Sequence, residues 1–400
     1  MRGPGCSFPH AGRSNSLRLS RRSTTHRDLC FASVLIGPHL HLYKVPICFH
    51  KPGRQIFDNL LRFACPSHLK LRCYNMGSHT DSDEHILITG AGGFIGQEIS
   101  NALLSSNQSL RLTLADVFEP PSPNASRTTA IKADLTTQAA VESLLSSQKW
   151  SACYLLHGIM SGGAEANLDL GLAVNVDSHR LVLDYLRKHQ PGVVVIFPSS
   201  LAVYGPPESP DQQYDEKTIP IPQSSYGAEK LIVETLVNDY SRRGLIDGRV
   251  VRLPTVIVRP GAPSAAASSF ASGIVREPLK GVQSSMPVSK DLAMWVCSPK
   301  TVVKNLVAMK DVPKEKFAKN RGRVVNLPGQ TVTVRQILEA LGEVGGEKAL
   351  KLVEEKHDPK VEAIVASWPS RFDISLAQGL GMAADISLKE EVQSFAASLK

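Results

Sequence analysis

The chain has 400 residues, of which 42% are hydrophobic and 20% charged, with a formal net charge of +8. These proportions exclude wholesale disorder, collagen and coiled coil, and no run approaches the ~20 consecutive apolar residues that a membrane-spanning helix needs. At roughly 150 residues per domain, the length predicts two or three domains, or one large α/β domain with an appendage.

Residues 1–75 differ from the remainder in charge. They hold 12 of the 45 Lys and Arg and only two acidic residues, so they carry +10 and leave −2 for the other 325 residues. The basic charge therefore gives no reason to expect a nucleic-acid partner. This acid-poor leader is typical of an organelle transit peptide, and it fits equally an over-extended start before Met76. We expect a cytoplasmic protein, or a mitochondrial one if residues 1–75 direct import.

Five of the seven cysteines lie in this leader, and none of them forms a C-x2-C pair, so we expect no metal site. The body keeps only Cys153 and Cys297, both in apolar settings. That usage fits a reducing compartment without a disulfide framework.

From residue 85, apolar strand-like runs alternate with helical periods, which predicts βαβ units around a parallel sheet. The expected strands are 85–89, 110–115, 129–133, 152–157, 193–197 and 249–253, and the expected helices are 94–104, 168–186 and 226–240. Later apolar segments, at 302–309, 324–327, 334–341 and 364–368, alternate less regularly. We therefore predict an α/β fold with a Rossmann-type doubly wound sheet over 84–260. Residues 261–400 would form a smaller lobe with excursions back to the sheet.

The first chemical motif joins the first strand to the first helix. It places Gly90, Gly93 and Gly96 at intervals of three, with Phe94 and Ile95 opening the helix. Glycines at such a turn allow the backbone to approach a pyrophosphate, which then rests on the helix N-terminus. The stricter G-x-G-x-x-G spacing is not met, but the strand and the helix are both in position. The motif predicts nucleotide binding over a plain tight turn.

Two acidic residues follow the next strands. Asp116 ends the second strand, where a carboxylate accepts hydrogen bonds from the ribose hydroxyls and repels a 2′-phosphate, so NAD is favoured over NADP. The alternative for Asp116 is a loop cap. Asp134, before Leu135, fits either a hydrogen bond to the adenine amino group or the N-cap of a helix over 136–145.

The second motif is the pair Tyr226 and Lys230. Residues i and i+4 share a helix face, and an ammonium beside a phenol favours the phenolate, lowering its pKa toward working pH. Ser199 and Ser200 end the fifth strand, at the edge where open α/β sheets bind their ligands. Together these residues predict acid–base chemistry at the carboxyl edge of the sheet.

These motifs, in order and on their expected elements, resemble those of the extended short-chain dehydrogenase/reductases, the NAD-dependent epimerase/dehydratase family. Five further segments, 157–166, 168–175, 253–261, 265–279 and 366–373, resemble the D-erythronate dehydrogenase group within it. The similarity runs from about residue 85 to near the C-terminus and does not cover the leader.

The resemblance implies NAD-dependent oxidation of a secondary alcohol at C2 of a small sugar acid. Tyr226 would be the base, Ser200 would hydrogen-bond the same substrate oxygen, and Lys230 would lower the Tyr226 pKa and bind the nicotinamide ribose. Ser200 is chosen over Ser199 because its distance from Gly205 matches the family pattern. The residues that would hold NAD are Gly90, Gly93, Phe94, Ile95, Gly96, Asp116, Asp134, Leu135, His157, Asn175, Tyr226 and Lys230.

Two of these residues have competing interpretations. His157 is expected to pack beside the cofactor rather than to exchange protons, because Tyr226 already fills that role. Asn175 is similar to the family residue that supports the catalytic lysine, and it is equally well explained as a buried polar group of a helix.

The sugar acid requires its own contacts. We expect the Arg276 guanidinium to bind the carboxylate with both branches of its fork, with a surface ion pair to Glu277 as the alternative. The remaining candidates for the substrate are Ser161, Ser199, Ser200, Thr255 and Ser269. Arg371 is the second candidate for the carboxylate.

Two other functions stay open for this sequence. A nucleotide-sugar epimerase or dehydratase would reoxidise its NAD within each turnover, and a non-catalytic NAD-binding sensor would not use the intact tyrosine and lysine. The family also leads us to expect a homodimer formed through helices 168–186 and 226–240.

Overall fold

The computed structural model describes three long segments and three short strands near the N-terminus; the segments are residues 84–209, 211–317 and 322–399. Residue contacts divide the chain into two units, Met1–Ser78 and His79–Lys400. In the first unit an antiparallel sheet contains, in spatial order, β1 (Arg18–Ser20), β2 (Cys30–Ile36) and β3 (His41–Ile47). The rest of the predicted leader, residues 1–75, lies outside the described residues.

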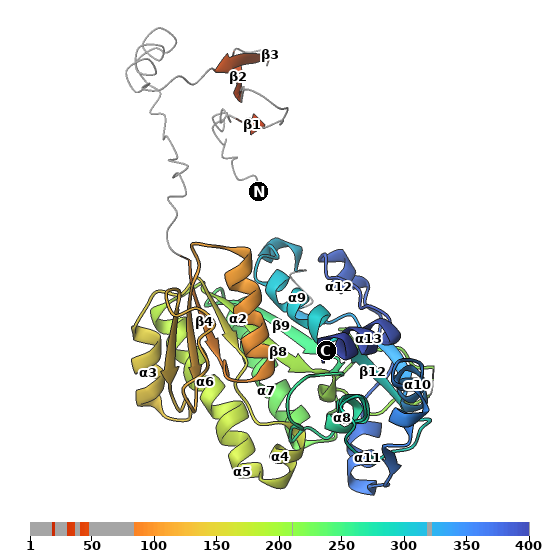
Figure 1. The fold of residues 1–400 in the computed structure, drawn as a ribbon. Coiled ribbons are helices and arrows are strands. Elements are labelled where there is room, and N and C mark those ends of the chain that lie inside the picture. Colours follow the sequence, from red (N-terminus) through yellow and green to blue (C-terminus); the bar gives the residue numbers. More distant parts are fainter. Residues whose placement is uncertain are drawn as a thin grey trace, which may run out of the picture. The chain divides into compact units, whose positions relative to one another are not determined.

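A seven-stranded sheet forms the centre of the second unit (Figure 1). Its strands, in spatial order, are β13 (Val324–Asn326), β9 (Asp247–Leu253), β8 (Val194–Ser200), β7 (Ala152–Leu155), β4 (His85–Thr89), β5 (Arg111–Asp116) and β6 (Thr128–Lys132). Every neighbouring pair is parallel. The chain runs outward from β4 to β6 and then returns to β7 on the other side of β4, so the strand order reverses there. This confirms the predicted Rossmann-type fold.

Helices cover both faces of this sheet, which is why its strands are almost continuously apolar. On one face, Ile86 and Ile88 of β4 pack in a core with α2 (Phe94–Ser106) and α9 (Pro299–Met309). On the other face, Leu87 shares a core with α3 (Gln138–Ser146), α6 (Ser178–His189) and α7 (Ser225–Arg242). The alternation of side chains along β4 thus serves two cores.

A smaller mixed region is built by the later part of the chain. Its two sheets consist of β10 (Thr255–Val256), β12 (Ala293–Cys297) and β14 (Gln330–Thr333), and of β11 (Ser284–Met286) and β15 (Val353–Glu355). They share one hydrophobic core with α8 (Ser269–Leu279), α10 (Val334–Leu350), α11 (Pro359–Ala366) and α13 (Leu388–Ser398). Two segments of the later chain, α9 and β13, join the large sheet instead.

The predicted helix 168–186 differs from the observed one. It contains α5 (Leu168–Gly171), a π-helix η1 (Leu172–Asp177) and then α6. The short remaining elements are α4 (Ser161–Ala166), α12 (Ser375–Gly379) and the 3-10 turns η2 (Leu201–Val203) and η3 (Lys314–Lys316). Among the described residues, no helix is long and apolar enough to cross a bilayer.

Candidate active site

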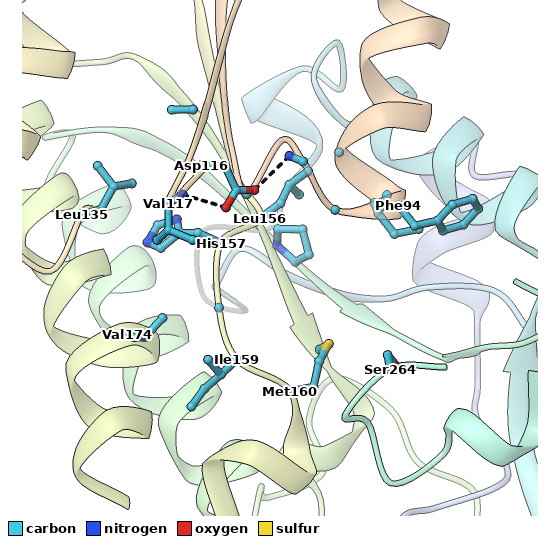
Figure 2. Close-up of a pocket in the computed structure, with 18 of the residues that line it drawn as sticks. Phe94, Asp116, Val117, Leu135, Leu156, His157, Ile159, Met160, Val174 and Ser264 are labelled. Atoms are coloured by element: carbon cyan, nitrogen blue, oxygen red, sulfur yellow. Dashed lines mark hydrogen bonds between the residues drawn. The ribbon is translucent and has the colours of Figure 1, made fainter. Parts of the chain in front are cut away.

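A cavity of about 860 Å³ opens along the carboxyl ends of β4, β5, β7 and β8, at the point where the strand order reverses. This size and place are those expected for a bound dinucleotide in an open α/β sheet. Most of the predicted cofactor and catalytic residues line it, namely Gly90, Gly93, Phe94, Ile95, Gly96, Asp116, Asp134, Leu135, His157, Tyr226 and Lys230, and so does Ser199, which was predicted to bind substrate. Figure 2 shows Asp116 at one end of this cavity, with Met160 and Ser264 farther along it.

The glycine turn brings main chain close to main chain. Gly90 has φ +65°, and a Cβ there would lie 2.6 Å from the backbone nitrogen of His157. A Cβ on Gly96 would lie 2.7 Å from the carbonyl oxygen of Gly90. Gly93 is the N-cap of α2 and gives no side-chain hydrogen bond, so the first N–H groups of the helix remain available to a ligand. These features fit a pyrophosphate at the helix N-terminus.

The Asp116 carboxylate lies beside this turn (Figure 2). Its Oδ2 accepts a hydrogen bond from the Gly92 N–H at 2.9 Å, and its Oδ1 accepts one from the Val117 N–H at 2.8 Å. The first bond ties the end of β5 to the glycine turn. The carboxylate is therefore held in the cavity wall next to the place where a ribose would follow the pyrophosphate.

Asp134 does not cap a helix, contrary to one of its two expected roles. The N-cap of α3 is Thr137, whose hydroxyl accepts from Ala140. Asp134 instead accepts from the backbone N–H of Thr136 at 3.1 Å and from its hydroxyl at 2.8 Å. The helix begins later than the sequence indicated, which leaves Asp134 in the cavity wall with Leu135.

His157 is fixed from both sides. Its Nδ1 lies 2.7 Å from the Thr89 hydroxyl, its Nε2 lies 2.9 Å from the Ser178 hydroxyl, and its ring stacks on His179 at 3.8 Å. Burial, together with the charge of Lys230, lowers the pKa of His157 to about 3. A ring that is neutral at physiological pH and held by two hydroxyls is poorly suited to exchange protons.

Tyr226 and Lys230 lie on α7, one turn apart on the face toward β8. The Ser224 hydroxyl caps the helix by accepting from the Gly227 N–H at 3.2 Å. The Lys230 ammonium donates to the carbonyl oxygen of Pro198 at 3.1 Å and lies 5.6 Å from the centre of the Tyr226 ring. The strand end and the helix thus hold the phenol and the ammonium in one cavity wall.

The electrostatics of this pair differ from the expectation. Burial, followed by the charge of Glu229, raises the pKa of Tyr226, and burial lowers the pKa of Lys230 to about 8 against the opposing effect of Glu234 and Glu229. The expectation that Lys230 lowers the tyrosine pKa counted the attraction between the two groups and omitted the loss of water around both. In this structure desolvation is the larger effect, and it favours the neutral forms.

The two serines at the end of β8 have different surroundings. Ser199 is 2% exposed, lines the cavity, and its hydroxyl has no hydrogen-bond partner among the described residues. Ser200, the predicted catalytic hydroxyl, does not line the cavity, and its Oγ accepts from the Ala202 N–H at 3.1 Å. Neighbouring side chains of a strand point to opposite faces, so only one of the two can face a given cavity.

Asn175 lies on the π-helix η1, is fully buried, and does not line the cavity. Its Oδ1 accepts from the Ile159 N–H at 2.8 Å, and its Nδ2 donates to the Ile159 carbonyl at 3.1 Å and to Glu229 at 2.7 Å. No hydrogen bond among the described residues joins it to Lys230. Asn175 uses its amide to hold the loop after β7 against α7, which fits its interpretation as a buried polar group of a helix. The expected support of Lys230 through the backbone and water stays a prediction.

Four residues expected to bind substrate also lie outside the cavity lining: Ser161, Thr255, Ser269 and Arg276. Thr255 is buried at the start of β10. Arg276 is 2% exposed; two of its nitrogens donate to Glu277, and Nη1 donates to the Arg259 carbonyl at 2.9 Å. The fork that was expected to bind a carboxylate is already occupied, and the pair with Glu277 is buried rather than on the surface. Arg371 lies elsewhere, at a separate small cavity.

Sequence reasoning missed several lining residues, chiefly Phe118, Ile159, Met160, Arg259 and Ser264. Phe118 lies two residues after Asp116, so its place just beyond the end of β5 was a usable indication. Nothing in the local sequence distinguishes Arg259 from Arg276, because both are arginines in the same Gly- and Pro-rich stretch.

Known proteins resemble this chain over most of its length beyond the leader. The model of the NAD dependent epimerase/dehydratase family matches residues 86–295. The D-erythronate dehydrogenase of Cupriavidus necator is 42% identical over 78% of this chain and 97% of its own, and that of Haemophilus influenzae is 41% identical over 78% and 98%.

Solved structures resemble the fold over a similar span. A nucleoside-diphosphate-sugar epimerase from Agrobacterium tumefaciens superposes with a TM-score of 0.71 at 34% identity, covering 80% of this chain and 96% of its own. A GalE-like L-threonine dehydrogenase from Cupriavidus necator, in its holo form, gives 0.70 at 26% identity over 79% and 100%.

Proposed function

The chain belongs to the NAD-dependent epimerase/dehydratase family, and from this premise we propose that it oxidises the C2 hydroxyl of D-erythronate, or of a closely similar sugar acid, to the 2-oxo acid. It is an NAD(P)-binding dehydrogenase of this family. The single observation that carries the chemistry is that Tyr226 and Lys230 wall the same cavity as the glycine turn of β4.

The proposed mechanism assigns one step to each of these side chains. A bound NAD would supply the acceptor for the hydride that leaves the substrate carbon. Tyr226, as the phenolate, takes the proton of the substrate hydroxyl at its phenolic oxygen. Lys230, held by the Pro198 carbonyl, keeps a positive charge near that oxygen and binds the nicotinamide ribose. His157 packs against the cofactor without exchanging protons.

A serine hydroxyl would bind the same substrate oxygen. We keep Ser200 in this role from the resemblance, with Ser199 as the alternative supported by its unpartnered hydroxyl and its place in the lining. Ser199→Ala and Ser200→Ala, compared in kcat, decide between them, because only the serine that binds the reacting oxygen should lower kcat strongly.

We propose NAD rather than NADP as the cofactor. Asp116 holds a negative charge at the end of β5, where a 2′-phosphate would have to lie. We also propose a homodimer, supported by the exposed apolar side chains Leu168, Leu170, Leu172 and Ile232 on α5, η1 and α7.

The experiment that tests the function measures NADH absorbance after D-erythronate and NAD are added to the purified protein. A dehydrogenase releases NADH continuously. A nucleotide-sugar epimerase, a function suggested by the Agrobacterium relative, would release none in net terms, and a sensor would bind NAD without turnover. L-Threonine, added in place of D-erythronate, is the matched control, because it is also a four-carbon acid with a secondary alcohol at C3 but carries an amino group instead of a hydroxyl at C2. NADH from L-threonine alone would contradict the proposal.

A further inference from the structure

Arg259 contributes the guanidinium in the cavity wall, and its charge is not balanced by a described acidic residue. Its Nη2 donates to the Ser264 hydroxyl at 3.1 Å, and its Nε is shut off from solvent without a hydrogen-bond partner among the described residues. Burial and the neighbouring charge of Arg276 lower its pKa, and no described carboxylate opposes them. An arginine stays protonated despite such a lowered pKa. A half-buried cation without a partner costs free energy unless a bound ligand supplies the opposite charge.

The buried arginines among the described residues all form ion pairs. Their side chains are 2–4% exposed, and the pairs are Arg249 with Asp247, Arg252 with Glu234, and Arg276 with Glu277. Arg259, which among the described residues is the arginine that lines the cavity, has no such carboxylate partner.

The backbone on either side of Arg259 is firmly held. Its N–H donates to the Ser272 hydroxyl at 3.3 Å, and its carbonyl accepts from Arg276 at 2.9 Å. Two residues of α8 therefore hold the backbone of Arg259 in place. The preceding Val258 is buried at φ +58°, a left-handed conformation that is rare and costly for a β-branched residue. Such strain persists only where the surrounding structure enforces it, and it concentrates at ligand sites.

Two serines that were expected to touch the substrate hold the loop that follows. The Ser269 hydroxyl accepts from the Ser264 N–H at 3.0 Å, and the Ser161 hydroxyl accepts from the Ala267 N–H at 3.1 Å. The Ala265 carbonyl accepts from the Gly162 N–H at 3.1 Å, joining the loop to α4. Hydrogen bonds thus hold the loop against α8 and α4, and the Arg259 guanidinium lies in the cavity lining without a carboxylate partner.

We propose that Arg259 binds an oxyanion of the bound reactants, either the carboxylate of the sugar acid or the pyrophosphate of the cofactor. The fork of a guanidinium matches both groups, since each presents two oxygens to paired N–H donors. The carboxylate source rests on the proposed function. Arg276 is then a positioning residue, which acts by holding the Arg259 carbonyl.

The test compares Arg259→Gln and Arg259→Lys with the wild type in two titrations. One measures the Kd of NADH by fluorescence, and the other measures the Kd of D-erythronate in the presence of NADH by calorimetry. If the carboxylate is the ligand, Arg259→Gln weakens D-erythronate at least about tenfold, the size of a lost hydrogen bond to a charged group, and leaves NADH unchanged. If the pyrophosphate is the ligand, NADH itself weakens at least about tenfold. Arg259→Lys keeps the charge without the fork, and it carries the test if the glutamine variant fails to fold.

Two controls make each outcome decisive. Erythritol, a neutral four-carbon polyol, should bind the wild type and Arg259→Gln alike if the arginine reads the carboxylate. Arg335→Gln removes an exposed arginine of α10 and should change neither Kd. If both Kd values of the folded Arg259 variants stay within about twofold of the wild type, the inference is wrong.

The inference and the proposed function fail separately. If the wild type neither binds nor oxidises D-erythronate, the proposed function is wrong, and the NADH titration alone decides the role of Arg259. Weaker NADH binding then supports the pyrophosphate as its ligand, and unchanged binding overturns the inference.

Discussion

The glycine turn after β4 and the loop after β10 both line the cavity, but the turn contributes backbone atoms and the loop contributes a side chain. The turn presents backbone: Gly90 and Gly96 approach other main-chain atoms, and the N–H groups at the start of α2 face outward. The loop presents one side chain, Arg259, and its position depends on hydrogen bonds to α8 and α4. A backbone site is damaged by adding atoms, whereas a side-chain site is damaged by removing charge. The following predictions use this difference.

The largest expected effect on activity comes from Tyr226 on α7, which also lines the cavity. Tyr226→Phe removes the proton acceptor and keeps the ring, so kcat should fall by at least about 10²-fold, as is typical for the loss of a general base, with the Kd of NADH unchanged. Steady-state kinetics and a fluorescence titration check both parts. Near-normal turnover would remove Tyr226 from the mechanism.

The second prediction concerns what holds α7 in place. Arg252 on β9 donates to both Glu234 oxygens, at 2.9 and 2.6 Å, and to the Tyr204 hydroxyl at 2.5 Å. Glu234→Gln leaves the arginine buried without a counter-charge and should lower the free energy of unfolding by about 3–5 kcal/mol.

Asp239→Asn is the matched control on the same helix. It breaks an ion pair with Arg242 that is open to solvent, so the unfolding free energy should stay close to that of the wild type. Denaturant titration of both variants gives the comparison. Equal losses would mean that the buried pair does not anchor α7.

The third prediction tests the backbone wall. Gly90 and Gly244 both have positive φ, but a Cβ meets the His157 backbone at Gly90 and nothing within 4 Å at Gly244. Gly244→Ala should cost about 1–2 kcal/mol of stability from conformation alone and leave NADH binding intact. Gly90→Ala should cost more and raise the Kd of NADH, because the turn must move away from β7. An unchanged Kd for Gly90→Ala would refute the backbone interpretation.

The fourth prediction follows from the raised pKa of Tyr226. The reaction needs the phenolate, and below the pKa its fraction rises about tenfold per pH unit, so kcat/KM for oxidation should rise with pH by about that factor. Lys230, with a pKa of about 8, loses its positive charge above that value, and the rise should become less steep there. A flat profile between about pH 6 and 8 would contradict Tyr226 as the base.

The smallest effect is expected at Asp116, whose carboxylate places a negative charge beside the glycine turn. The wild type should prefer NAD to NADP in kcat/KM, and Asp116→Ser should reduce that ratio by about fivefold or more, because two like charges about 4 Å apart repel by about 1 kcal/mol even in bulk water. Kinetics with both cofactors measure it. A wild-type preference for NADP would refute this assignment.

The local sequence alone predicted the large sheet and one wall of the cavity. β4 was predicted at its observed bounds, and the glycines, Asp116, Tyr226 and Lys230 all line one cavity. These features depend on contacts that short segments dictate: apolar runs form buried strands, glycines permit close turns, and i, i+4 residues share a helix face.

Only the tertiary structure decided which polar side chains face the cavity and which are used up inside the protein. Arg276 and Arg259 lie 17 residues apart in one stretch, yet the first is paired with Glu277 and the second faces the cavity. The pKa of Tyr226 likewise depends on how much water the surrounding elements remove. A motif identifies a charged group, but the partners and the solvent around that group come from residues distant in sequence, and they determine its free energy.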